Sequence, residues 1–182
     1  MNAPAALTHY PAAPPAQPVN RHTLFVLVDN EPGVLARIVG MFSARGYNID
    51  SLTVSETQHE AHISRITIVT AGTNDTIQQI KAQLSRLVPV HKVTDLTVSG
   101  PSIERELALV KVVAKGEMRV ESLRLAQAFG ARTVDATLKS FVFEITGTTE
   151  DIDRFVDMIQ PCGDIEVART GVAAIARGAE VR

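Results

Sequence analysis

Residues 24 to 57 read LFVLVDNEPGVLARIVGMFSARGYNIDSLTVSET. The five apolar residues at 24–28 are typical of a short buried strand, and the turn-forming residues 29–33 end it. Apolar residues then recur three and four positions apart, which predicts an amphipathic helix. They are Val34, Leu35, Ile38, Val39 and Phe42. Gly46 stands where a left-handed residue would close that helix, and the β-branched segment 48–57 predicts a second strand.

The same kind of pattern continues to about residue 98. Residues 62–70 predict a third strand, which forms a hairpin with the second. A second helix is expected to start at the capping residues 73–75 and to stop at Pro89, because four apolar residues share one face. These are Ile77, Ile80, Leu84 and Leu87. With a fourth strand at 90–98, the order is βαββαβ, which is typical of a ferredoxin-like unit.

The order recurs after the boundary signal Gly100-Pro101-Ser102. Thr148 and Asp151 resemble a capping box at the start of the last helix. The expected strands are 107–113, 131–137, 140–146 and 165–168, and the expected helices carry apolar faces at 120–129 and 152–159. The chain is therefore expected to be an α+β protein with two ferredoxin-like units. Its predicted parts are an Ala/Pro-rich flexible tail at 1–20, a first domain at 21–99 and a second at 100–182.

Composition excludes several classes of protein. Of the 182 residues, 45% are apolar, the net charge is −2 and there is one cysteine, Cys162. The chain lacks the basic cluster that nucleic acids or anionic membranes require, and no apolar run is long enough to span a bilayer. A single cysteine, expected to be a buried core thiol, gives neither a disulfide framework nor a zinc cluster. These features favour the cytoplasm, and the tail has no features of a targeting signal.

The first predicted strand is apolar on both sides. Phe25 and Leu27 have one parity, and Leu24, Val26 and Val28 have the other. If the two helices cover one face of the sheet, the opposite face is also apolar and has to be buried. Burial of each such side chain is worth about 1.5–3 kcal/mol. This is enough to drive self-association or packing of one half of the chain against the other, and it predicts at least a homodimer.

The turn before the first helix is a candidate ligand site. The first N–H groups of a helix have no partner within it, so a carboxylate can bind there. Gly33 permits close approach, and the amides of Asn30 and Asn48 can accept from an ammonium group. Three apolar neighbours suit an aliphatic side chain, namely Val34, Leu35 and Ile49. This combination fits a free aliphatic amino acid, although the same residues also fit a simple turn.

Motifs for catalysis are weak. His59-Glu60-Ala61-His62 is one residue short of the zinc-protease spacing and falls on a turn and strand. The acidic pairs Glu104/Glu106 and Asp151/Asp153 are interpreted as solvated groups or as helix-dipole partners. An RNA recognition motif shares the βαββαβ order, but it stacks bases on central-strand aromatics, and the third strand has Arg65 and isoleucines instead. The chain is therefore expected to have no catalytic residues and no metal site.

The strings DNEPGVLARIVGMFSARGYNIDSLTV, SRITIVTAG, SIERELALVKV and EVARTGVAAIARG resemble the ACT-domain family and, within it, the small subunits of acetolactate synthase. The resemblance covers nearly everything after the tail. It implies a regulatory subunit that activates a large catalytic subunit and confers feedback inhibition by valine, leucine or isoleucine. Thiamine diphosphate, magnesium and FAD would belong to that catalytic partner, and this chain would hold no cofactor.

The resemblance also implies a place for the effector, between two ACT domains of a homodimer. Asn30, Gly33, Val34 and Leu35 of one chain would face Asn48 and Ile49 of the other. A free-standing amino-acid sensor is the alternative within the same family. The role of the C-terminal half stays open at this point, because its apolar segments at 105–113 and 167–178 suit contact either with the catalytic subunit or with the first domain.

Overall fold

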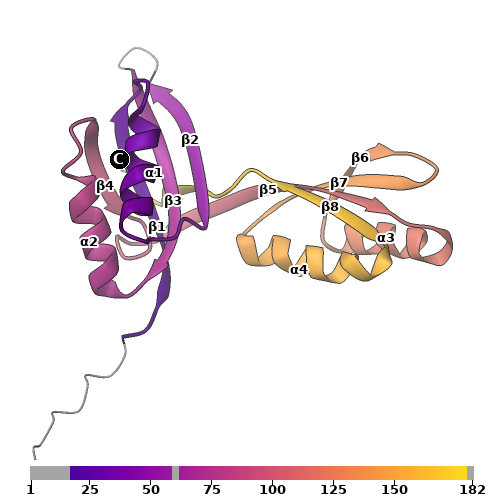
Figure 1. The fold of residues 1–182 in the computed structure, drawn as a ribbon. Coiled ribbons are helices and arrows are strands. Elements are labelled where there is room, and N and C mark those ends of the chain that lie inside the picture. Colours follow the sequence, from indigo (N-terminus) through magenta and orange to yellow (C-terminus); the bar gives the residue numbers. More distant parts are fainter. Residues whose placement is uncertain (1–16, 59–61, 180–182) are drawn as a thin grey trace, which may run out of the picture.

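The computed structural model describes residues 17–58 and 62–179. The first unit is an antiparallel sheet of order β2-β3-β1-β4 with α1 and α2 on one face (Figure 1). Its elements are β1 (Asn20–Asp29), α1 (Val34–Ala44), β2 (Ser51–Gln58), β3 (Ile63–Gly72), α2 (Asn74–Leu84) and β4 (Val90–Asp95). The predicted βαββαβ order is confirmed. β4 is shorter than expected, because the chain turns after Asp95.

The second unit repeats this arrangement with a sheet of order β6-β7-β5-β8. Its elements are β5 (Ser102–Val113), α3 (Gly116–Ala128), β6 (Arg132–Ala136), β7 (Ser140–Gly147), α4 (Thr149–Ile159), the short 3-10 helix η1 (Gln160–Cys162) and β8 (Asp164–Arg169). A further strand, β9 (Ala173–Ala176), pairs with the start of β5. The α+β class with two ferredoxin-like units is therefore confirmed, and β9 is an addition that the sequence patterns did not predict.

Local signals in the sequence explain where the helices begin and end. The Thr73 side chain accepts from the Thr76 N–H at the start of α2. Thr148 and Asp151 form the predicted capping box at the start of α4, each side chain accepting from the other residue's N–H. Gly46, after the end of α1, has φ +69°, a conformation that residues with a Cβ rarely adopt. Each of these predictions is confirmed.

Each unit has its own core between its helices and its sheet. In the first unit, Leu24, Val26 and Val28 of β1 pack with residues of β3 and both helices, including Ile38 and Phe42. In the second unit, β5 and β7 pack against α3 and α4 around Phe143 and Phe155, whose ring centroids are 6.3 Å apart. The apolar periodicity of the sequence thus specifies these two cores separately.

A third cluster covers the other face of the first sheet. We define the C-terminal ribbon as residues 102–105 of β5, residues 173–176, which pair antiparallel with them, and the preceding Val172. Val172 and Ala174 of the ribbon pack against residues of the first unit that point away from its helices, namely Phe25, Val69 and Leu96. Of the two ways of burying this face, the structure shows packing of one half of the chain against the other. The apolar segment at 167–178 contacts the first domain through the ribbon.

Arg65 of β3 fixes the ribbon on this face. Its guanidinium lies 4.1 Å from the centroid of the Phe25 ring and donates a hydrogen bond to the Ala174 carbonyl oxygen at 2.5 Å. A cation over an aromatic face is an attractive arrangement. Because β5 runs from this ribbon into the second sheet, one strand connects the two units (Figure 1). Residues 99 and 100, where the predicted domains meet, lie between the end of β4 and the start of β5.

β1 begins at Asn20, the last residue of the predicted tail. Residues 1–16 lie outside the described part of the chain. Within the described ranges, no helix combines the length and the apolar character needed to cross a lipid bilayer.

Cys162 is expected to react slowly with thiol reagents while the protein is folded. Its side chain is 5% exposed within the second core, as predicted, and burial raises the pKa of the thiol. Because the thiolate is the reactive form, modification by a disulfide reagent at pH 8 should be at least about 100-fold slower than in guanidinium chloride. A spectrophotometric assay of thiol modification measures both rates. Equal rates would contradict the buried placement.

Candidate functional site

The turn between β1 and α1 forms an exposed corner of the first unit. The Asn30 N–H donates to the His62 carbonyl oxygen at 2.6 Å, which ties the turn to the start of β3. Gly33 is the N-cap of α1, with φ +90°, and a Cβ built there would meet no atom within 4 Å. The backbone at the helix start is therefore open to approach by a ligand.

The start of α1 differs from the starts of α2 and α4, because no side chain caps it. The N–H of Arg37 donates to the Gly33 carbonyl at 3.0 Å, as the first turn of the helix requires. The N–H groups of Leu35 and Ala36, which precede it, have no acceptor one turn back within the helix. Together with the helix dipole, these donors can bind a carboxylate.

The apolar residues at the corner divide into two kinds. Val34 is 4% exposed and belongs to the core of the first unit, whereas Leu35 is 40% exposed. The Val34 side chain, expected as part of a ligand pocket, lies in the core in this structure, because the helical period turns it toward the sheet. Val34 can contribute only its backbone, and Leu35 is the apolar side chain at this corner that stays accessible.

The second half of the candidate site precedes β2. Asn48 is exposed, and its side-chain NH2 donates to an Asp50 carboxylate oxygen at 2.5 Å. That bond uses the donor side of the amide, so the amide oxygen is the group that could accept from an ammonium. Ile49 is half-buried against the first core. The Thr70 hydroxyl donates to the Asn48 carbonyl oxygen at 2.6 Å and holds this segment against β3.

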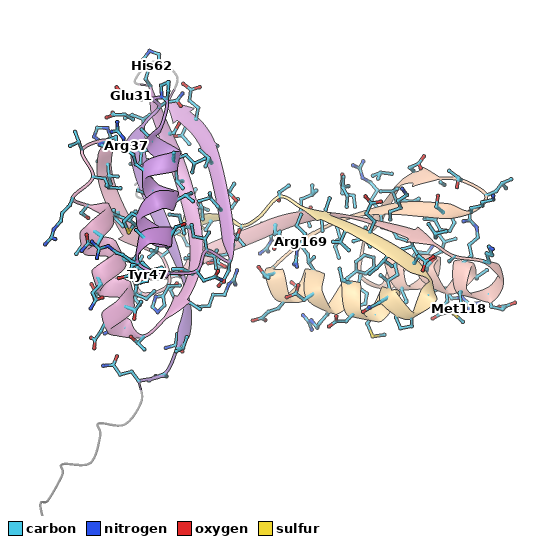
Figure 2. All side chains as sticks on the ribbon, viewed as in Figure 1. Glu31, Arg37, Tyr47, His62, Met118 and Arg169 are labelled. Atoms are coloured by element: carbon cyan, nitrogen blue, oxygen red, sulfur yellow. The ribbon has the colours of Figure 1, made fainter. Side chains whose placement is uncertain are left out.

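A single chain does not bring the two halves together. Asn30 to Leu35 lie at the start of α1 and Asn48 follows its end, with the 11-residue helix between them. At 1.5 Å per residue, that helix is about 16 Å long. Figure 2 shows Glu31 and Tyr47, which neighbour the two halves in sequence, near opposite ends of α1. One amino acid could touch both halves only if they come from two chains.

A second group of polar residues, not recognised from the sequence, lies where the two units meet. Glu106 is 6% exposed and accepts from the Arg169 guanidinium at 2.6 Å, and Arg169 also donates to Asp153 at 2.7 Å. Burial alone would lower the pKa of Arg169, but the bond to Asp153 and the charge of Glu106 outweigh it and raise that pKa. Glu106 and Arg169 border a cleft of about 350 Å³, which Asp50, Ser51 and Gly171 also line.

The interpretation of Glu106 as a solvated or helix-dipole group is therefore wrong. Its parity in β5 is that of Ala108, Val110 and Val112, which all point into the second core. A carboxylate at an inward position needs a partner, because an unpaired buried charge is costly. That parity was the signal in the sequence, and Arg169 on the neighbouring strand β8 is the partner.

The structure also bears on the alternative functions. An RNA recognition motif needs an accessible sheet face, but the C-terminal ribbon covers that face of the first sheet and buries Phe25. Among the residues with described coordinates, no three His, Cys, Asp or Glu side chains lie close enough together to hold a metal ion. His59, Glu60 and Ala61 of the near-motif lie outside the described residues. His62 is in a turn and has φ +49°.

Comparison with known proteins places both units. Residues 24–92 match the family model described as the AHAS small subunit-like ACT domain, and residues 105–178 match the model for the small subunit of acetolactate synthase. The chain is 44% identical over 158 residues to a probable acetolactate synthase small subunit of Archaeoglobus fulgidus, covering 87% of this chain and 98% of that protein.

Two further relatives have similar coverage. The acetolactate synthase isozyme 3 small subunit of Escherichia coli is 41% identical, with 88% of this chain and 98% of that protein covered. The crystal structure of the acetolactate synthase small subunit from Thermotoga maritima superposes with a TM-score of 0.79 at 34% identity, covering 88% of this chain and 99% of that chain. On these matches along nearly the whole described chain, the protein belongs to the family of acetolactate synthase small subunits.

Proposed function

We propose that this chain is the regulatory subunit of an acetolactate synthase, which raises the activity of a large catalytic subunit and makes it sensitive to feedback inhibition by a branched-chain amino acid. Valine is the first candidate, and leucine and isoleucine are the others. Catalysis, with its thiamine diphosphate, magnesium and FAD, takes place in the large subunit. The chain acts in the cytoplasm as part of that complex.

The observation that carries the sensing role is the uncapped start of α1 at Gly33. It offers free backbone donors to a carboxylate, beside the accessible side chain of Leu35. The Asn48 amide and Ile49 of a second chain supply the acceptor for the ammonium and further apolar surface. The homodimer follows from this division of the site. The apolar face of the first sheet no longer supports it, because the ribbon covers that face.

The energies are compatible with this proposal. Valine has about eight heavy atoms, and the best small ligands reach about 1.5 kcal/mol per heavy atom, so the roughly 8 kcal/mol of micromolar binding is attainable. The amino acid regulates the enzyme if it binds one arrangement of the dimer more tightly than another. A difference of about 1–3 kcal/mol between the two arrangements gives a 5- to 150-fold effect.

The direct test is to titrate valine, leucine and isoleucine into the isolated chain by calorimetry and into the complex reconstituted with the large subunit. We expect binding of at least one of them, and inhibition by the same one over the same concentration range. Activity of the large subunit should also rise when this chain is added. A folded dimer that gives no heat with any of the three amino acids would rule out the sensing role and leave only a scaffold.

Asn48→Ala is expected to weaken effector binding by about 10- to 100-fold, because a hydrogen bond to a charged group is worth roughly 1.5–3 kcal/mol. The inhibition curve of the reconstituted enzyme should shift to higher amino-acid concentration by the same factor. Asn74→Ala is the matched control, since Asn74 is also exposed but lies at the start of α2. Equal responses of the two variants would contradict a role for Asn48 in the site.

A further inference from the structure

The segment before β2 is held firmly against β3. The Asp50 N–H donates to the Val69 carbonyl at 2.8 Å, and the Thr70 hydroxyl donates to the Asn48 carbonyl at 2.6 Å. Asn48 is in turn bonded to Asp50 through its side chain. Residues 48–50 therefore form one small connected unit. A ligand that shifts Asn48 or Ile49 also shifts the first residue of β2, which is Ser51.

Ser51 contacts the chain close to its other end. The Val172 N–H donates to the Ser51 hydroxyl at 2.9 Å, although 121 positions separate the two residues. Next to it, Gly171 has φ +82°, and a Cβ built there would lie 2.8 Å from the Ser51 hydroxyl and 2.9 Å from the Thr53 hydroxyl. A residue with a Cβ would be strained at this φ and would force the Ser51 and Thr53 hydroxyls to move, so glycine suits this close approach. The backbone of residues 171–172 thus packs against side chains at the start of β2.

On the other side of Gly171, the chain is bound to the second unit. The Thr170 N–H donates to the Leu107 carbonyl at 3.0 Å, and the Leu107 N–H donates to the Thr170 hydroxyl at 3.1 Å. Arg169 connects β8 to Glu106 of β5 and to Asp153 of α4. Figure 2 shows Arg169 between the first unit and the helices of the second. Hydrogen bonds and ion pairs, joined by short stretches of chain, therefore lead without a break from residues 48–50 to α4.

The contact between Ser51 and residues 171–172 borders a cleft. Asp50, Ser51 and Gly171 line the cleft of about 350 Å³ between the units, and Arg169 and Glu106 line it from the second unit. A displacement of the start of β2 can therefore be taken up by a change in the angle between the units, because the cleft is not filled by protein atoms. The ribbon beyond Val172 stays attached to the first sheet through Ala174 and Arg65.

We propose that the contact of Ser51 with Gly171 and Val172 transmits effector binding from residues 48–49 to the second unit. This inference rests on the proposed function. Ser51 and Gly171 are positioning residues that act through this contact and do not touch the effector. The contact makes the position of residues 48–50 depend on how the two units are arranged. The effector therefore binds the two arrangements with different affinity and shifts their populations.

The test is Ser51→Ala, which removes the acceptor for the Val172 N–H and leaves Asn48 and Ile49 in place. In the reconstituted enzyme, we expect activation without amino acid to equal that of the original chain. In calorimetry, the dissociation constant for the effector should stay within about twofold. The fold-inhibition at saturating effector should fall by about fivefold, the factor that one ordinary hydrogen bond contributes. A purely structural defect would not separate binding from inhibition in this way.

Two further variants complete the experiment. Ser55→Ala is the matched control, because Ser55 shares the parity of Ser51 on β2 and is exposed beyond the contact. It should leave both binding and inhibition unchanged. Gly171→Ala places a methyl group against the Ser51 and Thr53 hydroxyls and should reduce the fold-inhibition further than Ser51→Ala. If thermal melting shows that this variant does not fold, the test of the proposal rests on Ser51→Ala alone.

Inhibition of the Ser51→Ala enzyme equal to that of the original chain would overturn the inference, and so would a parallel loss of effector binding. In both cases the original chain still binds and responds, so the proposed function stands. If the original chain itself binds none of the three amino acids, the proposed function fails instead. The two failures are therefore distinguished by the calorimetry of the unsubstituted chain.

Discussion

Replacing Gly33 with aspartate should raise the valine concentration for half-maximal inhibition by at least about 100-fold. The new carboxylate would lie at the start of α1, where the effector carboxylate is proposed to bind. Two like charges about 4 Å apart repel by roughly 4 kcal/mol at an effective dielectric constant of 20, and 1.36 kcal/mol corresponds to a factor of ten. Space is available for the new side chain, because a Cβ at Gly33 meets nothing within 4 Å.

Gly33→Asn is the control for the backbone. Asn and Asp both tolerate positive φ better than other residues, and they have nearly the same shape. The two variants therefore carry a similar conformational cost at φ +90°, and they differ in charge. Dose–response curves of the reconstituted enzyme with each variant measure the effect. If the asparagine and aspartate variants have the same valine sensitivity, charge at this corner is irrelevant and the carboxylate does not bind there.

Phe25→Ala should lower the free energy of unfolding by about 3–5 kcal/mol, the usual range for removing a fully buried phenylalanine. Phe25 is 1% exposed because the C-terminal ribbon and Arg65 cover it on the side away from the helices. In a sheet with that face open to water, the same substitution would cost far less. The size of the effect therefore reports whether the ribbon lies on the sheet in solution.

Urea unfolding followed by far-ultraviolet circular dichroism, at one fixed protein concentration, measures this change in a chain without tryptophan. Val54→Ala is the comparison, since Val54 is 44% exposed on the edge strand β2 and should cost no more than about 0.5 kcal/mol. A loss below about 1 kcal/mol for Phe25→Ala would show that the ribbon does not protect this face.

The element order could be predicted because each unit buries its own core. Residues such as Ile77, Ile80 and Leu84 repeat at helical spacing because α2 faces its own sheet, and all three are fully buried. Capping residues such as Thr73 and Thr148 act within one turn of the helix, so their roles follow from local sequence alone. Periodicity is informative wherever the burying surface is close in sequence.

The ribbon could not be predicted for the opposite reason. Ala173 to Ala176 form a short strand of mostly small residues, and the sheet that buries Ala174 ends about 80 residues earlier. The start of β5 was missed because its residues alternate with charges and face different partners along its length. Glu106 was misinterpreted because its position near an element start was given more weight than its inward parity.

The candidate site was predictable in part. The start of α1 at Gly33 follows from the turn residues and the helical spacing, and the structure places it on an accessible corner. The burial of Val34 also follows from that spacing, once the face of the helix is assigned to the core. The pairing of this corner with Asn48 depends on a second chain, whose position no pattern within one sequence specifies.

The late position of the ribbon in the chain matters for synthesis on the ribosome. The apolar face formed by Phe25, Val69 and Leu96 is complete once Leu96 has been made, but the residues that shield it end at Ala176. At roughly 5–20 residues per second, that interval lasts on the order of 4–16 s. During this interval the nascent first unit exposes its apolar face. A chaperone that binds exposed apolar surface would have its longest opportunity to act at this stage.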